Sequence, residues 1–288
     1  MKKLFIGCGV ACLVIILLLV VVGVASYQWV KKQVPHMHEV EQARTALLER
    51  FGPRDDFVPD LDGALRPERV QLFLAVRESL LTTRAEIGGR LEGFVGKTGK
   101  HFEGRNFFQK IIEGMSMAKG GVGLFGQATE YVGTRAQRLM ASEMGEGEYT
   151  YLFCLLSYCW LEWDPSKEFD PDWFASHDMK DAVDEFTMQH RRVFVKQLHN
   201  LRDKLEEKSP RTSEEEKNLE RVRQALQETR GDAFPFQGAM PAPWVAALEP
   251  FRQRFQATLP RSPGEYILES VEQLIDEEEK RGVRIHMD

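Results

Sequence analysis

A run without any charged residue, from Leu4 to Ala25, constrains this chain more than any other feature. As a helix rising about 1.5 Å per residue it extends roughly 33 Å, which is enough to cross a hydrocarbon core of about 30 Å. Most of its residues are Leu, Ile, Val or Phe, so transfer of the helix into lipid is favoured by about 4 to 9 kcal/mol. A core helix of a globular domain would carry a polar face, which this run lacks. We therefore expect a transmembrane helix.

A cleaved signal peptide is the alternative, since residues 23–25 are small enough for a cleavage site. The apolar run is longer than the roughly 7 to 15 residues typical of a signal peptide. It is followed by Tyr27 and Trp29 and then by Lys31 and Lys32. Aromatic rings at the headgroup level with lysines beyond them are typical of a retained span. The flanks therefore favour an anchor that stays in place.

The predicted anchor occupies residues 1–32 and contacts the lipid bilayer through residues 4–26. We expect a single-pass protein with its N-terminus inside and the bulk of the chain extracytoplasmic, because the N-terminal segment resembles an uncleaved signal peptide. The lysines on the two sides of the run nearly balance, so the charge rule for orientation adds little to this expectation.

The rest of the chain is acidic: all 44 acidic residues follow the run, together with 36 of the 38 basic ones, for a formal charge of −8. No long basic tract follows the juxtamembrane lysines, which argues against a nucleic-acid partner. Four cysteines are too few for a disulfide framework. Cys154 and Cys159 lie in an apolar stretch and are expected to be small buried side chains.

The hydrophobic spacing predicts an all-α fold, in which the N-terminal transmembrane helix precedes a multi-helix domain. A long antiparallel hairpin is expected over 178–230, with a capping box at Ser213–Glu216. We divide the chain into a helical domain at 33–230, a linker at 231–243 and a C-terminal helical pair at 244–288 packed on the same domain. One expected helix begins at Pro67 and carries Arg77 on its apolar face. A core helix is expected at 149–163, where Asp164-Pro165 stops it. The other expected helices are 38–51, 90–95, 106–118, 127–144, 178–207, 213–226, 244–259 and 263–280.

Three short motifs resemble ligand-binding loops, and each lacks an essential part. Gly96-Lys97-Thr98 has Leu91 where a phosphate-binding loop needs glycine. Gly121–Gly126 matches G-x-G-x-x-G without a preceding strand, so it is either flexible chain or close helix packing. Asp60-x-Asp62-Gly63 would place Arg69 where a calcium loop needs a carboxylate. We therefore expect no cofactor.

His177, Asp181 and Glu185 share one helical face at four-residue spacing and are the candidate metal ligands. The sequence has neither the Glu-x-x-His pairs of a di-iron bundle nor the His-Glu-x-x-His of a zincin. The alternative is a solvated face at the start of a helix, where acidic side chains are electrostatically favoured.

Three functions remain open. The first is a non-catalytic, membrane-anchored helical protein that binds a protein partner or assists envelope assembly, and the missing catalytic motifs favour it. The second is a membrane-tethered enzyme or metal protein that uses the face of His177, Asp181 and Glu185. The third is a small-ligand domain with a pocket under Trp160, Trp163, Trp173 and Phe174, although such aromatic side chains are more often core.

Overall fold

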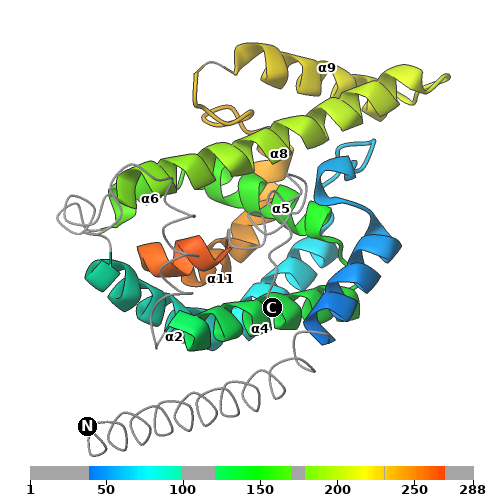
Figure 1. The fold of residues 1–288 in the computed structure, drawn as a ribbon. Helices are drawn as coiled ribbons and strands as arrows, with labels where there is room; N and C mark the ends of the chain where they lie inside the picture. The colour runs from blue at the N-terminus through cyan, green and yellow to red at the C-terminus, as the bar shows by residue number, and fades with distance from the viewer. Residues whose placement is uncertain (1–38, 99–120, 170–178, 230, 270–288) are drawn as a thin grey trace, which may run out of the picture.

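The computed structural model describes residues 39–98, 121–169, 179–229 and 231–269, and the regular elements within them are helical (Figure 1). The all-α prediction is confirmed for this part of the chain. The expected membrane helix at 4–25 lies outside the described residues, as does the expected helix at 106–118. Among the described helices, none combines the length and the apolar character that a bilayer span requires.

Helix 39–51 comes first, and the predicted helix at 38–51 is thereby confirmed. Residues 52–66, which contain only the short η1, join this helix to α2. The last described element is a helical stretch at 263–269. The elements between are η1 (Arg54–Asp56), α2 (Pro67–Thr98), α4 (Gly121–Ala141), α5 (Glu146–Cys154), the π-helical η3 (Leu155–Trp160), α6 (Pro165–Glu168), α8 (Met179–Glu207), α9 (Ser213–Glu228), α10 (Ala242–Leu248), η4 (Glu249–Phe251) and α11 (Arg252–Thr258).

The most apolar stretch forms the centre of the fold, as expected. Every residue from Tyr149 to Trp160 is buried, on α5 and η3. Figure 1 shows α8 passing on one side of α5, and the paired α2 and α4 on the other. The helix ends at Trp160, before the predicted stop, because Glu162 adopts a left-handed φ of 52°. Asp164 instead caps α6 by accepting a hydrogen bond from the Ser166 backbone N–H.

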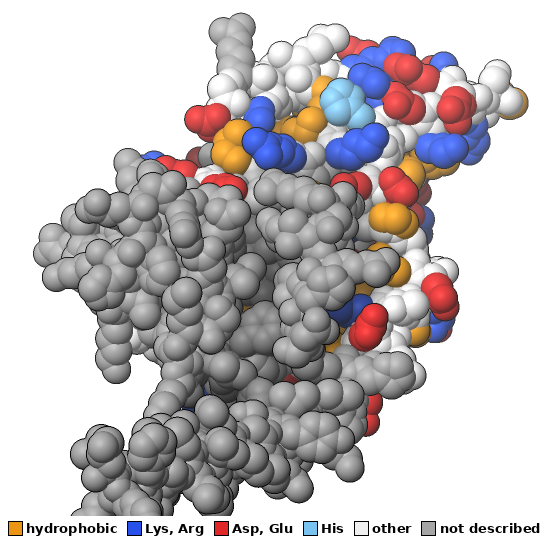
Figure 2. All heavy atoms as spheres, viewed as in Figure 1, with side chains coloured by type: hydrophobic (Ala, Val, Ile, Leu, Met, Phe, Trp, Pro, Cys, Tyr) orange, Lys and Arg blue, Asp and Glu red, His pale blue; other side chains and the backbone are white. Residues whose placement is uncertain are grey.

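The predicted helical hairpin is confirmed: α8 and α9 are joined by a short turn and pack along each other. The predicted capping box is displaced by one residue. Thr212, not Ser213, is the N-cap, and its hydroxyl accepts from the Glu215 N–H while the Glu215 carboxylate accepts from the Thr212 N–H. This register lets Glu215 also pair with Lys208. Figure 2 shows basic and acidic side chains intermixed over the exposed surface of the hairpin.

Glycine-rich chain after Gly88 was expected to break into short helices, and this prediction is wrong for the described part. Helix α2 continues unbroken to Thr98, and Gly121–Gly126 form the first turns of α4. Gly88 and Gly264 are needed for close helix packing, because a Cβ on Gly264 would lie 2.1 Å from the Gly88 carbonyl oxygen. The absence of side chains at this point lets stretch 263–269 lie directly against α2.

Six charged side chains, all buried, form a cluster between α2, α4, α5 and stretch 263–269, and we call it the buried charge cluster. Its members are Arg77, Arg84, Arg135, Glu146, Glu265 and Glu269. Arg84 donates to Glu265 Oε2 at 3.1 Å and to Glu269 Oε1 at 2.6 Å, and Arg77 donates to Glu269 Oε2 at 3.3 Å. With three positive and three negative members, the cluster is formally neutral, as burial requires.

Glu269 is the central acceptor of this cluster. Burial alone would favour its neutral form, but Arg77, Arg84 and Arg135 together hold its pKa at about 2. Its backbone carbonyl also accepts from Arg135 at 3.2 Å. The C-terminal stretch is thereby attached to the core through charges as well as apolar contacts.

The segment from 231 to 243 packs on the same core. Phe234 stacks on Tyr158 with ring centroids 4.2 Å apart, and Phe236 meets Trp244 edge-on at 5.1 Å. Cys159 donates its thiol hydrogen to the Pro235 carbonyl. Cys154 and Cys159 are both free and buried, which confirms the expectation for these two residues.

Candidate functional site

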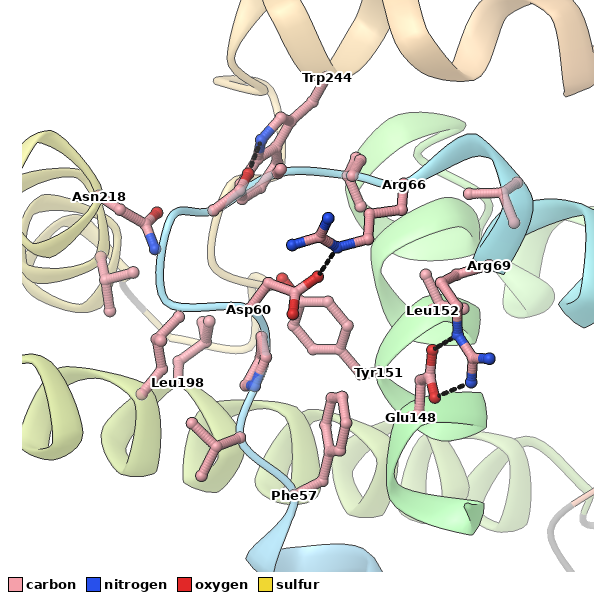
Figure 3. Close-up of a pocket in the computed structure, with 18 of the residues that line it drawn as sticks. Phe57, Asp60, Arg66, Arg69, Glu148, Tyr151, Leu152, Leu198, Asn218 and Trp244 are labelled. Atoms are coloured by element: carbon pink, nitrogen blue, oxygen red, sulfur yellow. Dashed lines mark hydrogen bonds and ion pairs between the residues drawn. The ribbon is translucent and has the colours of Figure 1, made fainter. Parts of the chain in front are cut away.

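A cavity of about 310 Å³ lies beneath the loop formed by residues 57–66, where α2, α5, α8, α9 and α10 meet (Figure 3). We call it the loop cavity. Its lining residues are Phe57, Val58, Pro59, Asp60, Gly63, Ala64, Leu65, Arg66, Arg69, Val70, Glu143, Glu148, Tyr151, Leu152, Leu198, Leu201, Asn218, Val222 and Trp244.

The floor of the loop cavity is apolar. Tyr151 and Leu152 come from the central α5, and Leu198 and Leu201 come from the inward face of α8. Val222 closes the floor from α9. All five side chains are buried in the core, so they lie behind the cavity and contribute little accessible surface to it.

Ion pairs surround this apolar floor. Arg66 donates from Nε to Asp60 at 2.7 Å and lies 3.6 Å from Asp62, and these carboxylates raise its pKa. Arg69 binds Glu148 through both carboxylate oxygens, its Nε lying 2.6 Å from Oε1, and this hydrogen bonding raises the pKa of Arg69. Figure 3 shows the Arg66–Asp60 pair near the centre of the view, with the Arg69–Glu148 pair beside it.

The remaining charged residue of the lining, Glu143, pairs with Arg50 at 2.9 Å. Each charged side chain that lines the loop cavity therefore already has a partner of opposite sign. The side chains of the pairs at the mouth are about half exposed or more, so these pairs add little to the stability of the fold.

The loop above the cavity is fixed in place by side chains from two helices. Asn218 of α9 donates to the Leu61 carbonyl at 3.0 Å, and Trp244 of α10 donates from its indole to the Gly63 carbonyl at 2.7 Å. Gly63 has a φ of +67°, and a Cβ there would lie 2.4 Å from the Asn218 side chain. A preformed cavity of this kind binds without first ordering its walls.

The loop cavity combines residues that the sequence did not connect. Residues 52–66 were expected to be a loop, and they contain only the short η1. In the sequence, Asp60 and Asp62 were considered only as ligands of an incomplete calcium loop. Both instead pair with Arg66. Trp244 was expected only as the start of a helix. The two aspartates followed by an arginine are the one local signal for the site.

The predicted metal face is not placed by the structure. His177 and the side chain of Asp181 lie outside the described residues, and Glu185 is exposed on α8. Among the described residues, no group of three His, Cys, Asp or Glu side chains comes together to hold a metal ion. The face of His177, Asp181 and Glu185 therefore stays a prediction.

The predicted aromatic pocket is described in part. Trp160 and Trp163 are buried in the core, while Trp173 and Phe174 lie outside the described residues. Trp163 also lines a second hollow of about 410 Å³ with Phe169.

No protein-family model matches this chain, and neither a curated protein nor a solved structure matches it.

Proposed function

We propose that this protein is a single-pass, membrane-anchored binding protein, whose helical domain holds a protein partner at the loop cavity. The observation that carries the proposal is the cavity itself: an apolar floor surrounded by paired charges, beneath a loop fixed by Asn218 and Trp244. Anchor side chains of protein partners bind in preformed pockets of this kind, and the surrounding polar contacts exclude water.

The lining supports binding more than catalysis. Its charged groups are paired arginines and carboxylates, and its floor is made of Leu, Val and Tyr side chains. An anchor at residues 4–26 would hold this domain beside the bilayer, where partners in the same membrane are concentrated. Assembly of an extracytoplasmic, membrane-bound complex is the role that fits both the predicted anchor and the loop cavity.

The proposal is tested by photocrosslinking in the native membrane. The reactive amino acid p-benzoylphenylalanine replaces Ala64, which is exposed at the cavity, or Ala75, which is exposed on α2 and does not line it. We expect one discrete crosslinked protein from position 64 and none from position 75. Equal crosslinking from both positions, or none from either, would contradict the proposal.

A further inference from the structure

We infer that the loop cavity accepts one large uncharged side chain, aromatic or leucine-like, presented by the protein partner. This inference rests on the proposed function and adds the chemistry of the bound group. It follows from three properties of the cavity: its volume, the state of its charges and the nature of its floor.

The volume is suited to one large side chain. At about 310 Å³, the loop cavity is at the lower end of the roughly 300 to 1,000 Å³ range of ligand pockets. A helix with its side chains is about 10 to 12 Å wide and needs a groove, not a hole of this size. One large side chain fits, with the rest of the partner lying outside on the loop and its neighbours.

The charges select a neutral guest. Arg66 is paired with Asp60 and Asp62, Arg69 with Glu148, and Glu143 with Arg50. A positive or negative guest would have to separate one of these pairs or remain unpaired beside the apolar floor. Because these pairs are partly exposed, a charged guest gains little by exchanging one partner for another. A neutral apolar guest leaves every pair intact.

The floor supplies the attraction. Leu198, Leu201 and Val222 line the floor with aliphatic side chains that are almost fully buried, and Tyr151 adds an aromatic ring. An aromatic side chain buries about 150 to 250 Å² when it is fully enclosed. The paired arginines and carboxylates then surround the guest and shield it from water, which is the arrangement found around dominant residues of protein interfaces.

The test uses random-peptide display against the full-length protein in lipid nanodiscs. Wild type is compared with Ala64→Trp, which fills the mouth of the cavity, and with Ala75→Trp as the matched control. We expect the selected peptides to share one Phe, Trp, Tyr or Leu position without a fixed charge. Their affinity should fall about tenfold or more in Ala64→Trp and stay unchanged in Ala75→Trp. Unfolding midpoints check that each variant folds, and Ala64→Phe replaces Ala64→Trp if it does not.

Each other result has a defined meaning. A fixed Lys, Arg, Asp or Glu in peptides that Ala64→Trp weakens would overturn the inferred guest and leave the proposed function standing. If no selected peptide is sensitive to Ala64→Trp, both are wrong. The last measurement is the binding of free N-acetyltryptophanamide, which is followed through the indole N–H resonance of Trp244. Binding of this compound as tight as that of the peptides would assign the cavity to a small molecule and overturn the protein partner.

Discussion

Arg84 and Glu269 form a buried ion pair, with Nη1 2.6 Å from Oε1 and the two side chains only 1% and 3% exposed. Arg84 belongs to α2, whereas Glu269 is the last described residue of the chain. The pair therefore joins a helix of the first third of the chain to the C-terminal stretch. The attachment depends on complete pairing, because a buried charge without its partner is strongly unfavourable.

Replacing Glu269 with Gln should destabilise the domain by about 3 to 5 kcal/mol, because Arg77 and Arg84 lose a buried counter-charge. Urea unfolding of the detergent-solubilised protein, followed by tryptophan fluorescence, measures this change. Glu78→Gln is the control, since Glu78 forms an exposed pair with Arg254. Its cost should stay within about 1 kcal/mol. Equal costs for the two variants would show that the buried charge cluster is not important for stability.

The free energy of unfolding should fall in mild acid because of His190. Burial lowers the pKa of this histidine to about 3, while in the unfolded chain it is about 6.5. Unfolding therefore takes up a proton between these values, and stability falls as the pH drops through this range. From about pH 7.5 to about pH 5 the loss is about 2 kcal/mol.

The control for this pH effect is His190→Gln, which retains a polar group near the Tyr158 hydroxyl, now 3.3 Å from His190 Nδ1. The difference in pH dependence between wild type and variant isolates His190, because His199 and the carboxylates contribute equally to both. Identical pH profiles of the unfolding free energy would contradict the assignment.

Gly264, which packs against α2, and Gly89, which lies within α2, should respond to alanine in opposite directions. Gly264→Ala places a Cβ 2.1 Å from the Gly88 carbonyl and should destabilise the fold by about 1 to 3 kcal/mol. Gly89→Ala has open space around its Cβ in the interior of α2 and should stabilise it by about 0.5 to 1 kcal/mol. Thermal unfolding of both variants provides the comparison, and a loss of stability in Gly89→Ala would be inconsistent with this packing.

The predicted anchor can be tested by alkaline carbonate extraction of membranes. The full chain should remain in the pellet, and a chain that lacks residues 1–32 should move to the supernatant, because about 4 to 9 kcal/mol of insertion free energy is removed. A full chain found in the soluble fraction would show that the segment is cleaved or does not insert.

Local patterns predicted the helices well, because burial of one face leaves a periodic trace in the sequence. Val183, Phe186, Phe194 and Leu198 of α8 were expected to point inward and are all buried. Arg77 was placed on the apolar face of its helix, but its partner Glu269 is 192 residues away. No pattern within a single segment reports a pair at that distance.

The loop cavity could not be predicted for the same reason. Its loop was recognised, but Leu198, Val222 and Trp244 reach it from separate helices. The N-cap of α9 and the end of η3 also differ from the prediction, since they depend on local backbone conformation, a cap at Thr212 and a left-handed Glu162.

The central claim, that the loop cavity holds a protein partner, is tested most directly by the affinity of the crosslinked partner for full-length variants. We predict that Ala64→Trp raises its dissociation constant by about tenfold or more, and that Ala75→Trp leaves it unchanged. Equal affinity of wild type and Ala64→Trp for that partner would contradict the claim.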